Sequence, residues 1–340
     1  MSRPVRIAVI GAGLVARRSH LPAYAACDEA QVEVLVSGSV ERARLVAAEF
    51  GITRVLGSWE EAVADPEIDA VDVCVPNHLH APIAIAAARA GKHVIVEKPM
   101  ALTVAEADAM IAAAREAGVV LAVAHNLRYA PIYETVKRVV SEGTIGRPLS
   151  VRAVFMHAGP DEFWGATSDW FWKAEQAGGG ALFDMGIHMI DLVRWFVDRP
   201  VLEVTAITSR TLKPTPFDDN AIALLRFEGD VIASVQASWS ARPFPDRQVM
   251  IHGELGHLAM GRSVEEPLVA YVLGGEHGQK IVPEIPKEST RLNPFVHFVR
   301  CIRDRAVPLT SGEEGRASLA VTLAAYEAAR TGCAVRGRWS

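Results

Sequence analysis

The stretch VRIAVIGAGLVA, residues 5–16, decides how the first half of this chain folds. Its apolar start predicts a buried β-strand, and the following glycines and alanine have the G-x-G-x-x-A spacing of a dinucleotide-binding turn. Such glycines let the backbone approach a pyrophosphate, which lies at the positive end of the next helix. The alternative is a glycine turn that only packs a helix on a strand. We expect a bound pyrophosphate, held by Gly11, Gly13, Leu14 and Val15.

Strands and helices alternate through the first 125 residues. Short apolar runs predict strands at 5–10, 32–36, 70–75, 93–97 and 119–125. Helical spacing occupies 14–26, 40–50, 58–64, 80–90 and 103–117. Nearly continuous apolar strands are typical of a parallel sheet covered on both faces. The pattern predicts an α/β fold for residues 1–125, a doubly wound Rossmann domain that binds a dinucleotide.

The pattern changes after residue 125. Helices are predicted near 131–142, before Phe196 and at 313–331, and a strand at 149–157. Long alternating stretches with glycine turns follow at 201–210, 220–240 and 247–261. Alternation of this kind is typical of an antiparallel sheet with one open face. We expect an α+β second domain over 126–340, which binds substrate and forms oligomer contacts.

Composition excludes several classes of protein. The 340 residues, half of them hydrophobic, are enough for two domains. The net charge of −5 comes from 35 basic and 40 acidic residues without long runs of either sign, which gives no support to a nucleic-acid or anionic-membrane partner. The four cysteines are scattered, and no uncharged apolar stretch of about 18 residues predicts a membrane span. The N-terminus does not resemble a signal peptide. We expect a cytoplasmic protein.

The stretch LVSGSVERA, residues 35–43, bears on the choice of nucleotide. Sites that prefer NAD place an acid at this point to bind the ribose 2′-hydroxyl, whereas this chain has Ser37, Gly38 and Ser39 there. Small hydroxyls leave room for a 2′-phosphate, and Arg42 is placed to pair with its charge. The alternative is that these are ordinary loop residues. We expect NADP(H) to be favoured over NAD(H).

Two further stretches carry side chains suited to catalysis. In VIVEKPMALT, residues 94–103, Glu97, Lys98 and Pro99 interrupt a buried strand. A lysine there is either functional or reaching for solvent, and Pro99 fixes a tight turn, with a cis peptide bond as one way to make it. In GGGALFDMGIHMID, residues 178–191, Asp184 and His188 are four residues apart and share a helix face. Alone, that pair is either core scaffolding or part of a catalytic site.

Together these stretches resemble the Gfo/Idh/MocA family of oxidoreductases, which includes glucose–fructose oxidoreductase and inositol dehydrogenase. The resemblance covers essentially the whole chain, and further stretches carry it: residues 76–103, AHNLRYAP at 124–131, NPFVHFVRCIRD at 293–304 and LAVTLAAYEAARTG at 319–332. It implies a Rossmann domain followed by a large open antiparallel sheet, and a homodimer or homotetramer formed through that sheet. It also implies hydride transfer between nicotinamide and a secondary alcohol, lactol or ketone of a sugar or cyclitol.

The resemblance places the family's catalytic residues on Lys98, Asp184 and His188. We interpret His188 as the base or acid, Asp184 as a substrate partner that also biases His188, and Lys98 as the donor that polarises the oxygen. The roles of Lys98 and His188 are exchangeable on the sequence alone. We also expect Gly178–Gly180 to allow close backbone approach near the substrate.

Further residues have weaker assignments. The expected nicotinamide contacts are Pro76, Asn77, His80, Glu97 and Lys98, although His80 is equally placed to cap its helix. The expected substrate contacts are Lys98, His125, Arg128, Trp172, Asp184 and His188. For Arg128 the alternative is structural pairing with an acid, and for the tryptophans it is packing.

Two alternatives differ in class from a dehydrogenase. One is a noncatalytic NADPH-binding sensor, against which the joint presence of Lys98, Asp184 and His188 argues. The other is a metal-assisted enzyme using His78, His80 or His125, but no His-x₃-His or Glu-x-x-His pattern supports it, and we predict no metal. Because the chain lacks a long exported N-terminal segment and keeps His188, we expect a dehydrogenase or reductase with an exchanging cofactor.

Overall fold

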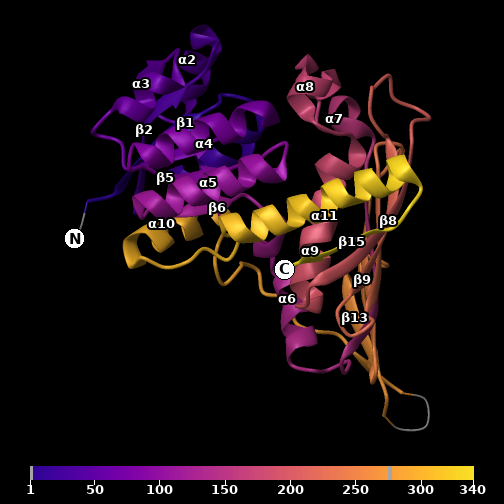
Figure 1. The fold of residues 1–340 in the computed structure, drawn as a ribbon. Helices are drawn as coiled ribbons and strands as arrows, with labels where there is room; N and C mark the ends of the chain where they lie inside the picture. The colour runs from indigo at the N-terminus through magenta and orange to yellow at the C-terminus, as the bar shows by residue number, and fades with distance from the viewer. Residues whose placement is uncertain (1–2, 275–277) are drawn as a thin grey trace. The chain divides into compact units, whose positions relative to one another are not determined.

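The computed structural model describes residues 3–274 and 278–340 and divides into two compact units (Figure 1). The first unit contains Met1–Asn126 and Arg291–Arg316, and the second contains Leu127–Thr290 and Ala317–Ser340. The sequence prediction assigned all of 126–340 to the second domain. The segment 291–316 packs in the first unit instead, because Phe295, Phe298 and Val299 join the apolar cluster of that unit's sheet.

The first unit is built on a parallel sheet, six-stranded within the described residues, in the order β3-β2-β1-β4-β5-β6. This is the doubly wound order, and it reverses between β1 and β4, where the carboxyl ends of the strands leave a crevice for a ligand. The predicted Rossmann fold is therefore confirmed. The strands are β1 (Val5–Ile10), β2 (Ala30–Val36), β3 (Arg54–Leu56), β4 (Ala70–Val73), β5 (His93–Val96) and β6 (Leu121–Val123).

Helices cover this sheet, and local sequence explains where they begin and end. Thr103 and Glu106 form a reciprocal capping box at the start of α5, and Gly118 ends that helix in the left-handed region. In Figure 1, α10 lies beside the indigo and purple elements of this unit although it comes late in the chain. The helical segments are η1 (Ala16–His20), α1 (Leu21–Ala25), α2 (Val40–Glu49), α3 (Trp59–Ala64), η2 (Asn77–Leu79), α4 (His80–Arg89), α5 (Val104–Ala117) and α10 (Pro294–Asp304).

The second unit contains a large sheet, nine-stranded in the part of the chain that the structure describes. Its order is β14-β13-β12-β11-β7-β10-β9-β8-β15, and every neighbouring pair is antiparallel except β7 and β10. The strands are β7 (Pro148–Met156), β8 (Val201–Ser209), β9 (Asn220–Phe227), β10 (Ile232–Ser238), β11 (Asp246–Gly253), β12 (Gly256–Met260), β13 (Leu268–Val272), β14 (Gln279–Ile281) and β15 (Val335–Trp339).

One face of this sheet is covered and the other is open. Ala221, Ala223 and Leu225 of β9 are buried, while Ile222 and Leu224 between them are about half exposed. This alternation confirms the predicted open sheet. The covering segments include α9, which contacts β7 and β10, and α6. The helical segments of this unit are η3 (Asn126–Tyr129), α6 (Pro131–Ser141), α7 (Gly159–Glu162), η4 (Asp169–Trp172), α8 (Ala174–Ala177), η5 (Leu182–Gly186), α9 (Ile187–Val197) and α11 (Gly312–Thr331); η3 and α11 each begin in the first unit.

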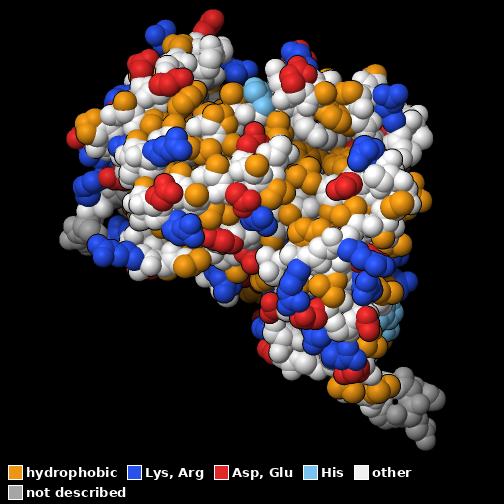
Figure 2. Space-filling view, in the orientation of Figure 1, with side chains coloured by type: hydrophobic (Ala, Val, Ile, Leu, Met, Phe, Trp, Pro, Cys, Tyr) orange, Lys and Arg blue, Asp and Glu red, His pale blue; other side chains and the backbone are white. Residues whose placement is uncertain are grey.

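The surface agrees with the balanced composition of the sequence. On the face shown in Figure 2, acidic and basic side chains are interspersed rather than gathered by sign. Across 3–274 and 278–340, no helix is both long enough and apolar enough to span a membrane. All four cysteines are free thiols.

Candidate active site

The turn after β1 has the geometry that a dinucleotide site requires. Gly11 has φ +120°, and a Cβ there would lie 1.8 Å from the Cys74 carbonyl oxygen, so glycine is required. A Cβ on Gly13 would meet nothing within 4 Å, which leaves this turn open in front of the following helix. Leu14 is partly exposed and Val15 is exposed beside it. The first unit therefore brings the predicted pyrophosphate residues together at the carboxyl edge of its sheet.

The loop after β2 gathers the residues expected to choose the nucleotide. The side chain of Ser39 caps α2 by accepting from the Arg42 amide at 3.4 Å. The Arg42 guanidinium lies 3.5 Å from Ser37 Oγ, and a Cβ on Gly38 would meet nothing within 4 Å. Two hydroxyls and one guanidinium thus surround an open loop without an acid among them. Each of these groups can donate a hydrogen bond to an acceptor placed over the loop.

The segment after β4 contains the predicted nicotinamide contacts Pro76, Asn77 and His80. Pro76 is partly exposed and Asn77 is almost buried. His80 is fully buried, and its ring nitrogens lie 2.8 Å from the Pro99 carbonyl oxygen and 2.9 Å from that of Val75. Burial lowers the pKa of His80, although both carbonyls favour the charged ring. This placement favours a structural role, since the His80 ring ties the turn after β5 to the end of β4.

The segment after β5 carries Glu97 and Lys98. The Lys98–Pro99 peptide bond is cis, as the tight turn suggested. Lys98 is half-buried, and its backbone N–H donates to Glu97 Oε2 at 3.0 Å. Glu97 Oε1 lies 3.0 Å from the Nε2 of His20. His125 follows β6 at the same edge of the sheet and is buried.

The sequence analysis missed His20 and Asp72. The His20 Nδ1 lies 2.8 Å from Asp72 Oδ2, and both side chains are fully buried. Asp72 occupies the middle of β4, in an otherwise apolar run. A buried acid inside a strand needs a partner, and that rule was the available signal.

In the second unit Asp184 and His188 lie on one continuous helical segment. Asp184 belongs to the π-helical turn η5 and His188 to α9, which follows directly. Single π turns are frequent at functional sites. Asp184 is partly exposed and accepts from the indole N–H of Trp239 at 3.2 Å. His188 is 8% exposed, and its ring centroid lies 6.1 Å from that of Phe155.

Protein contacts account for the glycines before this helix. A Cβ on Gly180 would lie 1.9 Å from the Asp218 carbonyl oxygen, and one on Gly179 would lie 2.7 Å from the Tyr326 hydroxyl. The Tyr326 hydroxyl donates to Asp218 Oδ1 at 2.7 Å and accepts from the Gly180 N–H. Packing against these two residues accounts for Gly179 and Gly180, and the close approach to substrate expected of Gly178–Gly180 stays a prediction.

Arg128 and Trp172 lie in the same unit. Arg128 is 2% exposed and makes a bidentate pair with Asp191 of α9, at 2.8 Å and 2.7 Å. This geometry favours the structural alternative for Arg128 over direct substrate binding. Trp172 packs edge-on against Trp239, with ring centroids 5.8 Å apart, and Trp239 is the partner of Asp184. Trp172 therefore stays a candidate for substrate contact.

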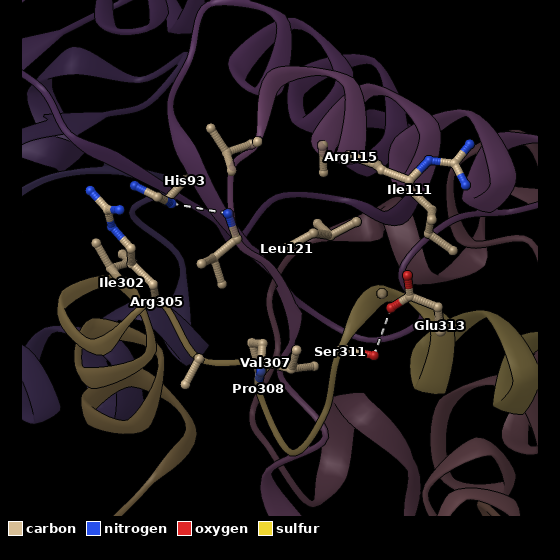
Figure 3. A pocket seen from close by; sticks show the side chains of 16 residues that line it. His93, Ile111, Arg115, Leu121, Ile302, Arg305, Val307, Pro308, Ser311 and Glu313 are labelled. Carbon is tan, nitrogen blue, oxygen red and sulfur yellow. Dashed lines mark hydrogen bonds between the residues drawn. The ribbon is translucent and has the colours of Figure 1, made fainter.

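A pocket of about 690 Å³ lies elsewhere in the first unit (Figure 3). It is lined by residues at the start of β5 and β6, the end of α5 and the segment 302–313, including His93, Leu121 and Arg305. These are the amino ends of the strands, opposite the edge that carries Lys98. The pocket is separate from the candidate active site. Among the described residues no group of three or more His, Cys, Asp and Glu side chains is placed to hold a metal ion.

Comparisons with known proteins give a consistent result. Residues 5–125 match the family model for the oxidoreductase family with an NAD-binding Rossmann fold, and residues 133–259 match the GFO/IDH/MocA C-terminal domain. The chain is 35% identical to 1,5-anhydro-D-fructose reductase of Ensifer adhaerens, over 96% of this chain and 97% of that protein. It is 32% identical to levoglucosan dehydrogenase of Pseudarthrobacter phenanthrenivorans, over 70% and 68% of the two chains.

A solved structure supports the same assignment. Levoglucosan dehydrogenase in complex with NADH and levoglucosan superposes with a TM-score of 0.85 at 26% identity, over 98% of this chain and 99% of that one. These relatives are named as enzymes, which gives no support to the noncatalytic sensor.

Proposed function

Because this chain belongs to the GFO/IDH/MocA family of NAD(P)-dependent oxidoreductases, we propose that it transfers hydride between NADP(H) and a carbonyl or secondary alcohol of an anhydro-sugar. The observation that carries the proposal is the carboxyl edge of the first unit's sheet. There the open Gly11–Gly13 turn follows β1 and Lys98 follows β5, and β4 lies between these two strands in the sheet. That edge is where such sheets bind dinucleotides.

Preference for NADP(H) rests on the loop after β2. Ser37, Ser39 and Arg42 supply hydroxyl and guanidinium donors where NAD-preferring sites have an acid. A 2′-phosphate gains charge-assisted hydrogen bonds from these groups, whereas a 2′-hydroxyl gains little.

Three side chains are proposed to carry the proton chemistry. When bound, the reduced nicotinamide supplies a hydride to the carbonyl carbon. His188 then gives a proton to the oxygen, or removes one from the hydroxyl in the oxidative direction. The Lys98 ammonium stabilises negative charge on that oxygen, and Asp184, held by Trp239, orients a substrate hydroxyl. The alternative exchanges the roles of Lys98 and His188.

An anhydro-sugar is the proposed substrate class for two reasons. One relative is named for reducing 1,5-anhydro-D-fructose, and another is solved with levoglucosan. In this chain Trp172, packed against Trp239 beside Asp184, offers an aromatic face of the kind that stacks on sugar rings.

The open face of the second unit's sheet is proposed to bind a second copy of the chain. Ile207, Leu224 and Ile232 are 77%, 54% and 56% exposed on that sheet. Contiguous exposed apolar side chains mark interaction sites. A homodimer or homotetramer by light scattering supports this, whereas a monomer contradicts it.

The free thiols are consistent with the proposed cytoplasmic location.

A substrate panel tests the proposal. Oxidation of NADPH and NADH is followed with 1,5-anhydro-D-fructose and keto-sugars, and reduction of NADP and NAD with levoglucosan, other sugars and inositols. Lys98→Ala is the inactive reference, and Lys280→Ala, which removes an exposed lysine paired with Glu266, is the matched control. We expect turnover of an anhydro-sugar that disappears only in Lys98→Ala. Equal turnover in both variants contradicts the role of Lys98, and turnover confined to inositols contradicts the substrate class.

A further inference from the structure

A buried chain of ionisable groups ends at Lys98. Asp72 of β4 lies 2.8 Å and 3.0 Å from the His20 Nδ1, and the His20 Nε2 lies 3.0 Å from Glu97. The second Glu97 oxygen accepts the backbone N–H of Lys98 at 3.0 Å. His20 and Asp72 are fully buried, and the Glu97 side chain is 16% exposed.

The partners of His20 fix its charge. Both ring nitrogens face carboxylate oxygens, which accept hydrogen bonds when ionised, so both bonds form only if each nitrogen carries a proton. Two buried carboxylates also need a cation between them. Burial opposes protonation, but Asp72 and Cys74 act together against it, and the pKa of His20 is raised well above its ordinary value. Burial also opposes ionisation of Glu97, yet His20 lowers the pKa of that carboxyl.

All the groups that face His20 support this state. Tyr24 of α1 donates to Asp72 at 2.9 Å, and burial, together with Asp72, raises the pKa of that phenol, which keeps it a donor. Burial raises the pKa of the neighbouring Cys74 thiol. The Phe295 ring of α10 also packs against His20, with the two ring centroids 4.1 Å apart.

His80 provides an internal comparison. Its nitrogens also face two acceptors, but these are neutral carbonyls, and burial lowers its pKa. Lys98 therefore lies between two neighbours that histidines hold: Glu97 is held by His20, and Pro99 by His80.

We propose that His20 is a positioning residue for Lys98: as an imidazolium between Asp72 and Glu97, it fixes the Glu97 carboxylate that holds the Lys98 backbone. This inference rests on the proposed role of Lys98 in the reaction. His20 acts on Lys98 through Glu97. Residues that hydrogen-bond to the ligands of a metal orient those ligands in the same indirect way. Removal of His20 takes away the cation that lies between Asp72 and Glu97, so repulsion between the two carboxylates loosens the hold on residues 97–98.

The test compares His20→Gln with His93→Gln, using 1,5-anhydro-D-fructose and NADPH as probes. His93 is at the amino end of the same strand β5, where its ring accepts the Val120 N–H, and it is the matched control. We expect His20→Gln to lower kcat by about 10–100-fold and to shift the pH profile of kcat, with the Kd for NADPH changed less than about twofold. His93→Gln keeps the wild-type kcat and pH profile.

Lys98→Ala distinguishes a failure of the proposed role of Lys98 from a failure of the inference about His20. If Lys98→Ala retains turnover, the proposed role of Lys98 fails. If Lys98→Ala is inactive while folded His20→Gln has the wild-type kcat and pH profile, the inference about His20 is overturned and the role of Lys98 stands. If both claims hold, Lys98→Ala is inactive and folded His20→Gln shows the lowered kcat and the shifted pH profile.

Side-chain ¹⁵N NMR of the wild-type protein gives a readout that needs neither turnover nor a folded variant of His20. The His20 signals are assigned through the shift that Phe295→Leu causes, because that ring lies against His20. We expect both nitrogens of His20 to be protonated at pH 7, above the ordinary pKa of a histidine. A neutral His20 at pH 7 overturns the inference.

Discussion

The first unit holds Glu97 against a histidine, whereas the second unit holds Asp191 against an arginine. The acid of each pair is close in sequence to a proposed catalytic residue. Glu97 directly precedes Lys98, and Asp191 lies three positions after His188 on α9. A guanidinium keeps its charge at every accessible pH, while an imidazolium loses its charge in the alkaline range. The helix of His188 therefore has a permanent anchor, and the segment of Lys98 has a titratable one.

The two clusters also differ in their connections. Ser318 of α11 donates to Asp191 at 3.0 Å and accepts from Arg194 at 2.9 Å, so two segments, η3 with Arg128 and α11 with Ser318, converge on one acid of α9. The His20 cluster runs in a line from Asp72 to Lys98. We infer that the Asp191 cluster serves stability and that the His20 cluster serves the position of the Lys98 side chain.

The largest expected effect is the loss of kcat when a proposed catalytic residue is replaced. His188→Asn removes the proposed proton carrier, and we expect kcat to fall by about 10²–10⁴-fold while the fold survives. Steady-state reduction of 1,5-anhydro-D-fructose by NADPH measures it. Near-normal kcat in folded His188→Asn contradicts the assignment.

The next effect is on stability. Arg128→Met leaves Asp191 buried without its cation, and we expect the free energy of unfolding to fall by about 3–5 kcal/mol. Urea unfolding measures it. The control is Arg147→Met, which removes an exposed pair with Glu254 and should cost no more than about 1 kcal/mol. Similar losses of unfolding free energy in Arg128→Met and Arg147→Met would contradict the claim that the buried pair contributes more to stability than the exposed one.

The pH dependence of stability distinguishes the two clusters. The pKa of His20 is raised on folding, so its stabilisation is complete below about pH 6.5 and is lost as pH rises through the folded pKa. The lowered pKa of Glu97 acts in the opposite range, and its contribution is lost as pH falls through the folded value. Above pH 6.5 the stability gap between wild type and His20→Gln should narrow by up to about 1.4 kcal/mol per pH unit. The gap for Arg128→Met should stay constant, and parallel narrowing in both contradicts the comparison.

The smallest expected effect is on the nucleotide. Arg42→Ala removes a partly solvated charge, and we expect about tenfold weaker binding of NADPH with unchanged binding of NADH. Fluorescence titration of both nucleotides measures the two Kd values. Equal binding of both by the wild type, with no change in the variant, rules out the preference for NADP(H).

Local patterns predicted the parts of the fold that local physics determines. The apolar run 5–10 coincides with β1, and the helix expected at 103–117 is α5, Val104–Ala117. β3 escaped prediction because it is a three-residue edge strand that begins at the exposed Arg54. The α10 segment was assigned to the wrong domain, because nothing in the local sequence indicates that Phe295 packs beside His20.

The same limit applies to the candidate site. Gly11 and Lys98 were recognisable because each interrupts an apolar strand at its carboxyl end. The pairing of His20 with Asp72 joins positions 52 residues apart, so only the misplaced acid in the strand gave a sign of it. The glycines before Asp184 were visible, but their partner, Asp218, was not.

Transfer of deuteride from the nucleotide to the sugar is the sharpest test of the proposed reaction. The enzyme is incubated with 1,5-anhydro-D-fructose and NADPH carrying deuterium on the transferred position of nicotinamide C4, and the sugar product is analysed by mass spectrometry and NMR. We predict one deuterium on the former carbonyl carbon in the wild type and in Lys280→Ala, and no product with Lys98→Ala. Oxidation of the nucleotide without deuterium in the sugar, or deuterated product from Lys98→Ala at the wild-type rate, would contradict the account.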